Sequence, residues 1–424
     1  MKTYRLLVGT LFMVGACTGV SRATPWHMAD TAATATYVPA STQGSSPTGS
    51  KASLQRECVQ VETESQQPVA AVGYAVLDEI ADLVTPLGIV QILDLSTGSS
   101  TRVGSERLVA AFPSVSPDRT HLAYSEFNKS DTVIRDGSVV IASADGEVLS
   151  RIERQDLALG LDGWLDNSHV LATLPGDYPS DMIVFDIATG ESEELEPPAN
   201  LQGMQGVLWG EGRAYDPSVS RVVYPRIQPG SPVEPATSSW VLESFPTGAE
   251  ISSLRTSDYR YSGPQWTSDG TLVALLGTPT ASGETGDELF GVTSDGEITQ
   301  LTSFGKDLGE HEIRRFSWSP EGDRIALFLT RGNDSQARET LVVVDANTLK
   351  AVDLCTLGES RLERYTISAG GATPPVWSPD GRLPLVEGRA DSGDVILFMV
   401  DLLEETAVQI GSNLLPRGWM LAAN

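Results

Sequence analysis

The sequence predicts an all-β fold, a β-propeller of seven four-stranded blades, with six or eight blades as the alternatives. Three observations support this prediction. A short phrase of turn-forming residues recurs about every 50 residues, and a second hairpin pattern follows each copy. The two ends of the repeated region are each incomplete, and each lacks the part that the other contains. A period of this length built from β-strands is typical of propeller blades.

The clearest copy of the phrase is WSPEGDRIAL, which starts at Trp318. Pro320 fixes φ for a tight turn, and Gly322 accepts the positive φ that such turns require. The residues from Arg324 onwards then suit a strand that packs on at least one face. Each copy therefore predicts a strand, a tight turn and a second strand, which together form one hairpin.

The other copies are found by aligning to this one. Their leading residues are Val115, Trp164, Tyr215, Trp266, Trp318 and Trp377, at intervals of 49, 51, 51, 52 and 59 residues. Because the tryptophans share one repeat position, we expect them to pack between blades rather than to act as functional residues.

An outer hairpin follows each copy, as in MIVFDIATGESEEL at 182–195, where an apolar strand and a more polar strand flank a short turn. Residues 88–103 resemble such a hairpin without an inner strand before it. Gly418-Trp419-Met420 resembles an inner strand with no hairpin after it. We therefore expect the C-terminal strand to join the N-terminal strands in one composite blade, which removes the exposed sheet edges of an open array.

Composition limits the choice of partner. The chain has 424 residues, 40% of them apolar, and a formal charge of 29 − 56 = −27. It can form a large core, and its globular part is too acidic to favour nucleic acid or anionic lipid.

The N-terminus resembles a bacterial lipoprotein signal. Residues 1–16 contain Lys2, Arg5 and an apolar run of 11 residues from Leu6 to Ala16, too short to span a bilayer. Cys17 follows Val14-Gly15-Ala16, as in a lipobox, and we expect it to carry acyl chains such as palmitate. The alternative is an ordinary secretory signal with an incidental cysteine. Residues 17–57, rich in Ser, Thr, Ala and Pro, are expected to form a disordered tether, and residues 58–424 the propeller.

Two further cysteines remain, Cys58 and Cys355. In an exported protein an even pair favours a disulfide, and we expect these two to bridge. Two free thiols are the alternative.

The repeated phrase and its spacing resemble the TolB-type, WD-like propeller repeat over about residues 85–420. Non-catalytic propellers of prolyl oligopeptidase-like peptidases belong to the same group. The resemblance implies a platform for protein or ligand contacts and no transferable catalytic residues. Two features differ: TolB has an α/β domain before its propeller, and no G-x-S-x-G hydrolase motif occurs here.

Loops expected on one face of the ring offer cationic and aromatic side chains, which are enriched at binding surfaces. Ordinary polar loops are the alternative. The candidate rim residues are Arg255, Tyr259, Arg260, Tyr261, Arg361, Arg364 and Tyr365.

His311, flanked by Glu310 and Glu312, is expected in a solvated charged loop, with a metal site as the weaker alternative. No cofactor or metal motif is found, and no catalytic residue is assigned.

The sequence thus predicts a lipid-anchored protein of the cell envelope, on the extracytoplasmic side of the membrane, whose propeller binds an unknown protein or envelope ligand. Two alternatives remain. One is a carboxylate-based hydrolase that acts on glycan or peptide at the mouth of the propeller. The other is an accessory subunit of a transporter or a cell-wall enzyme.

Overall fold

The structure is a computed structural model. It describes residues 54–62, 74–80, 88–104, 108–128, 137–153, 159–173, 182–195, 213–228, 237–245, 247–256, 263–279, 286, 288–331, 338–355, 373–389 and 395–421. The chain divides into two units, Met1–Ser50 and Lys51–Asn424, and all described residues belong to the second. The expected signal segment, Cys17 and most of the tether lie outside the described residues.

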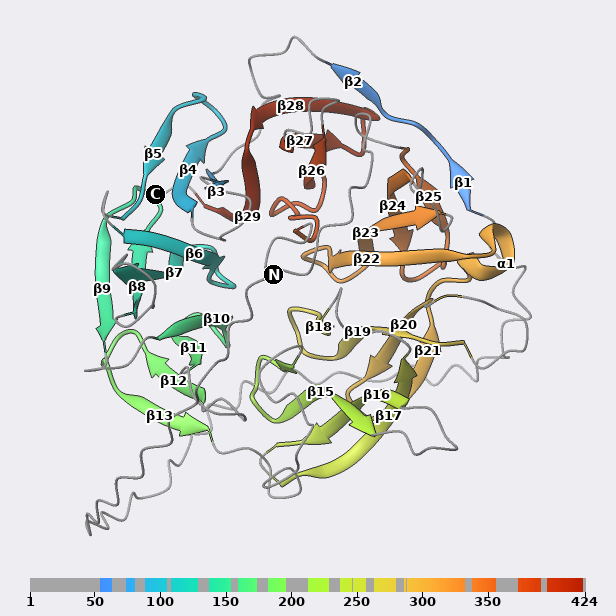
Figure 1. Cartoon of the computed structure of the whole chain (residues 1–424), viewed down its shortest axis with the longest axis horizontal. Helices are drawn as coiled ribbons and strands as arrows, with labels where there is room; N and C mark the ends of the chain where they lie inside the picture. Colours follow the sequence, from blue (N-terminus) through green and yellow to red (C-terminus); the bar gives the residue numbers. More distant parts are fainter. Residues whose placement is uncertain are drawn as a thin grey trace, which may run out of the picture. The chain divides into compact units, whose positions relative to one another are not determined.

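The fold is an all-β propeller in which six hydrogen-bonded sheets form a ring (Figure 1). Three sheets have four antiparallel strands in chain order. They are β10 (Gly160–Trp164), β11 (His169–Thr173), β12 (Met182–Asp186) and β13 (Ser192–Leu195); β14 (Ala214–Tyr215), β15 (Arg221–Gln228), β16 (Thr237–Ser244) and β17 (Ala249–Thr256); and β18 (Gln265–Trp266), β19 (Leu272–Gly277), β20 (Glu288–Thr293) and β21 (Ile298–Gln300).

Two sheets gain an extra strand from the start of the unit. In each, the N-terminal strand pairs in parallel with the outermost strand. The first sheet contains β22 (His311–Trp318), β23 (Arg324–Arg331), β24 (Arg338–Asp345), β25 (Ala351–Asp353) and β1 (Gln55–Arg56). The second contains β26 (Leu385–Arg389), β27 (Val395–Asp401), β28 (Thr406–Ser412) and β2 (Gln60–Glu62).

The residues between β1 and β2 hold this N-terminal segment in place. The amide of Glu57 donates to the Asp353 carbonyl at 2.9 Å, and the amide of Gln60 donates to the Glu405 carbonyl at 2.9 Å. Cys58 lies between them and is joined to Cys355 by a disulfide, with 5.0 Å between the two Cα atoms. The segment therefore covers the outer edges of two neighbouring sheets. Strand β1 lies within the range that the sequence assigns to the tether.

The sixth sheet has eight strands and contains both ends of the repeated region. Its members are β29 (Leu414–Met420), β3 (Tyr74–Ile80), β4 (Gly88–Asp94), β5 (Ser100–Arg102), β6 (Leu108–Val115), β7 (His121–Asn128), β8 (Gly137–Ser143) and β9 (Val148–Glu153). A single residue pair, Gly88 with Ala110, links β4 to β6.

The ring closes through the C-terminal strand, as the sequence predicts. Strand β29 pairs antiparallel with β3 from Leu414–Glu79 to Met420–Tyr74. Gly418 is packed so closely that a Cβ atom there would lie 2.4 Å from Cγ2 of Val115 on β6. Any side chain at this position would separate the closing strand from its neighbour.

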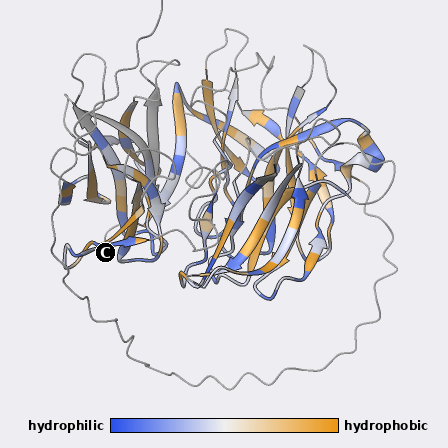
Figure 2. Cartoon of the chain, turned by 60° about the horizontal axis from the view of Figure 1, so that its bottom comes forward, coloured by the Kyte–Doolittle hydropathy of each residue, from blue (hydrophilic) through white to orange (hydrophobic). Residues whose placement is uncertain are grey.

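The apolar core lies within the blades and between adjacent blades. Apolar residues lie along many strands (Figure 2), and the middle strands β8, β19 and β23 are buried over almost their whole length. Such a pattern is expected of strands that are covered on both faces. One cluster joins Leu289 of β20 and Phe304 to Phe316 and Leu327 of the next sheet. Another joins Phe328 of β23 to Trp377 and Phe398. The clusters therefore hold each blade against the next around the ring.

Among the described residues there is one helix, α1 (Phe304–Leu308), between β21 and β22. No described helix is long and apolar enough to cross a membrane.

Candidate binding site near the ring axis

The leading tryptophans fix the innermost strands to one another. Each indole Nε1–H donates to a backbone carbonyl of the preceding blade, always that of the residue just before the leading residue. The bonds are Trp164 to Ser114 (2.9 Å), Trp266 to Ala214 (3.2 Å), Trp318 to Gln265 (3.0 Å), Trp377 to Ser317 (3.1 Å) and Trp419 to Val376 (3.2 Å). A net contribution of about 1 kcal/mol is typical of such a bond. The tryptophans are structural, as the sequence predicts.

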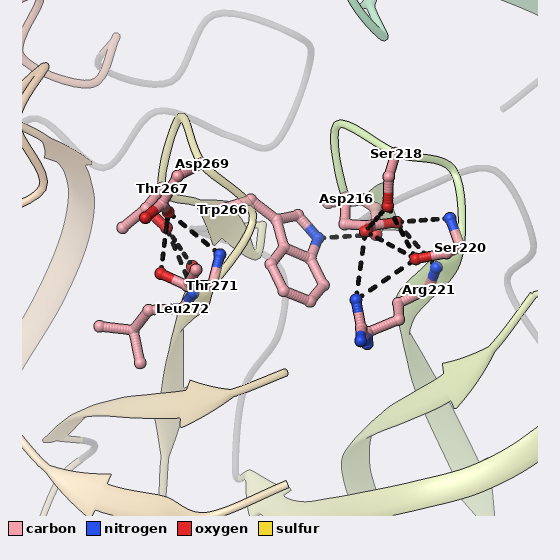
Figure 3. A network of polar contacts seen from close by, with 10 residues as sticks. Asp216, Ser218, Ser220, Arg221, Trp266, Thr267, Asp269, Thr271 and Leu272 are labelled. Atoms are coloured by element: carbon pink, nitrogen blue, oxygen red, sulfur yellow. Dashed lines mark hydrogen bonds and ion pairs between the residues drawn. The ribbon is translucent and has the colours of Figure 1, made fainter. Parts of the chain in front are cut away.

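In the turns that follow the leading residues, polar groups form hydrogen bonds with one another. Figure 3 shows two of them, with Trp266 between them. Asp216 accepts from the amides of Ser220 and Arg221, each at 2.7 Å. Asp269 accepts from the Thr267 hydroxyl at 2.7 Å and the Thr271 amide at 3.0 Å, and the Thr267 bond is the largest cause of its lowered pKa. These carboxylates stabilise the turns, so they are poor candidates for binding a ligand.

The turns and the longer connections lie at opposite ends of the ring. In an antiparallel blade the first-to-second and third-to-fourth turns share one end, and the remaining connections leave from the other. The tight turns that start at Ser116 and Ser143 belong to the first group. The connections from β7 to β8 and from β9 to β10 belong to the second. We call these the turn end and the loop end.

Bulges place charged residues on three innermost strands, which lie nearest the axis in Figure 1. The register shifts at Asp162 in β10, at Arg314 and Arg315 in β22, and at Arg417 in β29. A bulged residue leaves the regular ladder and its side chain is redirected, which is why bulges are frequent beside functional sites. In this chain the redirected residues carry charge.

The first charged group consists of Asp162 and Arg213, and it lies beside Tyr215, where the repeat has tyrosine in place of tryptophan. Tyr215 takes the tryptophan position, and its hydroxyl is buried without a hydrogen-bond partner in the described part of the chain. Burial raises its pKa to about 12, against the opposing effect of the Arg213 charge. The Asp162 side chain is accessible to solvent, yet protein surrounds it closely enough to raise its pKa, which Arg213 partly offsets.

The second charged group combines β22 and β29. Burial lowers the pKa of Arg315, and the positive charges of Arg314 and Arg417 lower it further, while Glu387 on β26 acts in the opposite direction. Like charges are therefore held close together in a partly buried place. In a chain of net charge −27 this is a local concentration of positive charge.

Of the candidate rim residues, only Arg255 is described. It lies on β17 with an exposed side chain, and its carbonyl accepts from the Thr278 amide at 2.9 Å. Tyr259, Arg260, Tyr261, Arg361, Arg364 and Tyr365 lie outside the described residues. The candidate rim therefore stays a prediction.

The expectation of a solvated loop at His311 is wrong. The histidine begins β22 and is 6% exposed. Its Nδ1 lies 2.8 Å from the Gly309 carbonyl, and its Nε2 lies 3.6 Å from Oε1 of Glu288. Glu288 also accepts from the Thr302 hydroxyl at 2.6 Å and from the Gly305 amide at 2.7 Å. These bonds hold α1 against β20. No group of three metal-ligating side chains occurs among the described residues.

The sequence analysis did not identify the charged residues of the innermost strands as candidates, although the sequence contains a signal for most of them. Two residues before the leading position, three copies have proline, at Pro113, Pro264 and Pro375. Three others have a charged residue at that place, namely Asp162, Arg213 and Arg417. A departure from proline at a fixed repeat position therefore marks most of this site.

Known structures share the fold at low sequence identity. TolB from Acinetobacter baumannii matches at 13% identity and TM-score 0.44, over 88% of this chain and 98% of that one. An acylaminoacyl peptidase from Pyrococcus horikoshii matches at 15% identity and TM-score 0.50, over 77% of this chain and 48% of that one. An oligogalacturonate lyase in complex with manganese matches at 13% identity and TM-score 0.50, over 80% of this chain and 85% of that one. No protein-family model and no curated protein matches the chain.

Proposed function

We propose that this chain is a membrane-anchored, extracytoplasmic lipoprotein whose propeller binds a protein or an envelope ligand at the loop end of the ring. The observation that carries the proposal is the contrast between the two ends. The turn end consists of short turns whose polar groups bond to one another. The loop end receives the longer connections. On the innermost strands, the charged residues Asp162, Arg315 and Arg417 lie in bulges, outside the regular hydrogen-bond ladder. Variable loops on a rigid scaffold are a common arrangement for binding.

Site-specific photo-cross-linking in intact cells tests this proposal. A photoreactive residue is placed at Tyr261 or Arg364 for the loop end. The matched control is Leu403, which is 69% exposed in a turn at the opposite end. We expect a defined cross-linked partner from the first two positions and none from Leu403. Cross-links from Leu403 alone would contradict the proposal. The partner's identity also tests whether the chain is an accessory subunit of a transporter or cell-wall enzyme.

The anchor has its own test. We propose that Cys17 is acylated, on the basis of the lipobox-like residues before it. Growth with a fatty-acid analogue should label the wild-type protein, and Cys17→Ala should lose the label. Labelling that persists in Cys17→Ala would refute lipidation at this residue.

We infer further that the ring has seven blades. In this interpretation the eight-stranded sheet is two blades, because β4 pairs with β6 at one residue pair but with β5 at three. A crystal structure in which β4 and β6 form a continuous ladder would refute this count.

A hydrolase is the second candidate, and Asp162 is the observation that favours it. A carboxyl group with a raised pKa beside Arg213 and Tyr215 suits proton transfer. The test is hydrolysis of glycan and peptide libraries by the wild type and by Asp162→Asn. Activity that disappears in the variant supports the hydrolase, and equal turnover by both excludes this carboxyl group.

A further inference from the structure

Arg315 differs from the other arginines in how it is placed. It lies in the bulge of β22, between the residues Ile313 and Phe316 that resume the ladder. Its side chain is about half-buried, and its guanidinium makes no hydrogen bond or ion pair within the described residues. Leaving a partly buried polar group without a partner costs free energy, so such a group usually has a ligand or another role.

Two other arginines among the described residues, Arg382 and Arg331, are paired with a carboxylate. Arg382 donates to Asp401 from Nε at 2.9 Å and from Nη2 at 2.6 Å. Arg331 is likewise bonded to Asp353. Both acids are almost fully buried. The Arg331 pair links β23 to β25, with β24 between them, and the Arg382 pair links the turn before β26 to β27. Arg315 has no such contact.

The charges around Arg315 do not neutralise it. Arg314 pairs with Glu312 at 3.4 Å, and Arg417 on β29 adds a further positive charge. Glu387 attracts Arg315, but it also accepts from the amide and the hydroxyl of Thr373, each at 3.3 Å. Arg315 therefore lies near two positive charges and the carboxylate of Glu387, and that carboxylate also binds Thr373.

We propose that Arg315, together with Arg417, binds an oxyanion of the ligand, a carboxylate or a phosphate group. The inference rests on the proposed binding function and specifies the chemistry of what is bound. A guanidinium offers forked donors that match the two oxygens of either group, and arginine retains its charge when partly buried. An oxyanion between the two side chains would relieve the repulsion between them and satisfy the donors of Arg315.

Isothermal titration calorimetry tests the proposal. The probes are inorganic phosphate and succinate, each titrated at constant ionic strength against chloride. The variant is Arg315→Gln, and the matched control is Lys350→Gln, which removes one positive charge from an exposed position on the same blade. We expect saturable binding to the wild type and to Lys350→Gln, and at least ten-fold weaker binding to Arg315→Gln.

The outcomes separate the sources of the oxyanion. Binding of phosphate alone supports a phosphate-bearing ligand, and binding of succinate alone supports an acidic peptide or sugar acid. Binding that is equal in Arg315→Gln and the wild type overturns the proposal, as does no saturable binding of either probe to the wild type.

Thermal unfolding separates binding from folding. Because the Arg315 guanidinium makes no hydrogen bond or ion pair within the described residues and lies near two like charges, Arg315→Gln should unfold at or above the wild-type midpoint. A fall of several degrees would show a structural role and overturn the inference. If the loop-end cross-links persist in Arg315→Gln while anion binding is absent from the wild type, the binding function stands and the oxyanion site does not. If the wild type binds the anions but gives no loop-end cross-links, the oxyanion site stands and the proposed binding function does not.

Discussion

The carbonyl of Arg119 accepts a hydrogen bond of 3.0 Å from the amide of Leu421, the residue that follows the closing strand. Arg119 has φ of 63°, in the left-handed region, at the turn position that Gly270, Gly322 and Gly381 occupy in other blades. Burial lowers the pKa of its guanidinium, while the nearby Glu321 and Asp380 act in the opposite direction. The composite blade has no turn between β29 and β3, and Arg119 contacts the end of the chain there.

The backbone of Arg119 can be tested by paired substitutions. Both Arg119→Gly and Arg119→Ala remove the side chain, but only glycine adopts a left-handed φ without steric cost. We expect Arg119→Ala to be less stable than Arg119→Gly by about 1 kcal/mol in denaturant unfolding. Gly322→Ala is the control at the equivalent turn and should lose a similar amount relative to the wild type. Equal stability of the two Arg119 variants would show that this φ imposes no strain.

Removal of a single indole hydrogen bond should affect all seams alike, including the closing one. Trp419→Phe retains an aromatic ring but loses the donor to Val376, and Trp266→Phe loses the donor to Ala214. Since the carbonyl loses its partner and the larger ring is replaced, each variant should lose about 1–3 kcal/mol of unfolding free energy. A much larger loss for Trp419→Phe would show that the closing seam is the weakest part of the ring.

The disulfide between Cys58 and Cys355 links residues 297 apart in the sequence. Closing so long a loop restricts the unfolded chain, and contributions of about 2–4 kcal/mol are typical. Cys58→Ser should therefore lower the thermal midpoint of the oxidised protein, and the difference should vanish under reducing conditions. Non-reducing peptide mapping is the direct measurement, and free thiols at both positions would contradict the bridge.

The repeat positions explain why much of the fold could be predicted. Trp318 and Trp377 share one repeat position, so their common role was evident from spacing alone, and the incomplete pattern at Trp419 indicated the closure. Bulges leave no such record, because one extra residue in a strand does not alter the apolar pattern enough to be noticed. Arg315 is therefore identified only from the strand register, whereas Asp162 stands at a repeat position that has proline in other copies. The parallel pairing of β1 was hidden for another reason, since Gln55 and Arg56 have no apolar alternation.

Asp162 and Asp269 should respond to pH in opposite directions. The protein that surrounds Asp162 reduces the hydration of its carboxyl group and raises its pKa in the folded state, so the ionised form opposes folding above that pKa. Asp162→Asn should then be more stable than the wild type at pH 7, and the gain should shrink as the pH falls towards 3.8, the ordinary pKa of an aspartate. Hydrogen bonds from Thr267 and Thr271 lower the pKa of Asp269, so its ionised form favours folding. Asp269→Asn should therefore be less stable at pH 7, and the loss should disappear as the pH falls through the folded pKa, below 3.8. Chemical unfolding from pH 3 to pH 8 measures both variants, and a loss of stability in Asp162→Asn at pH 7 would show that its attraction to Arg213 outweighs the cost of burial.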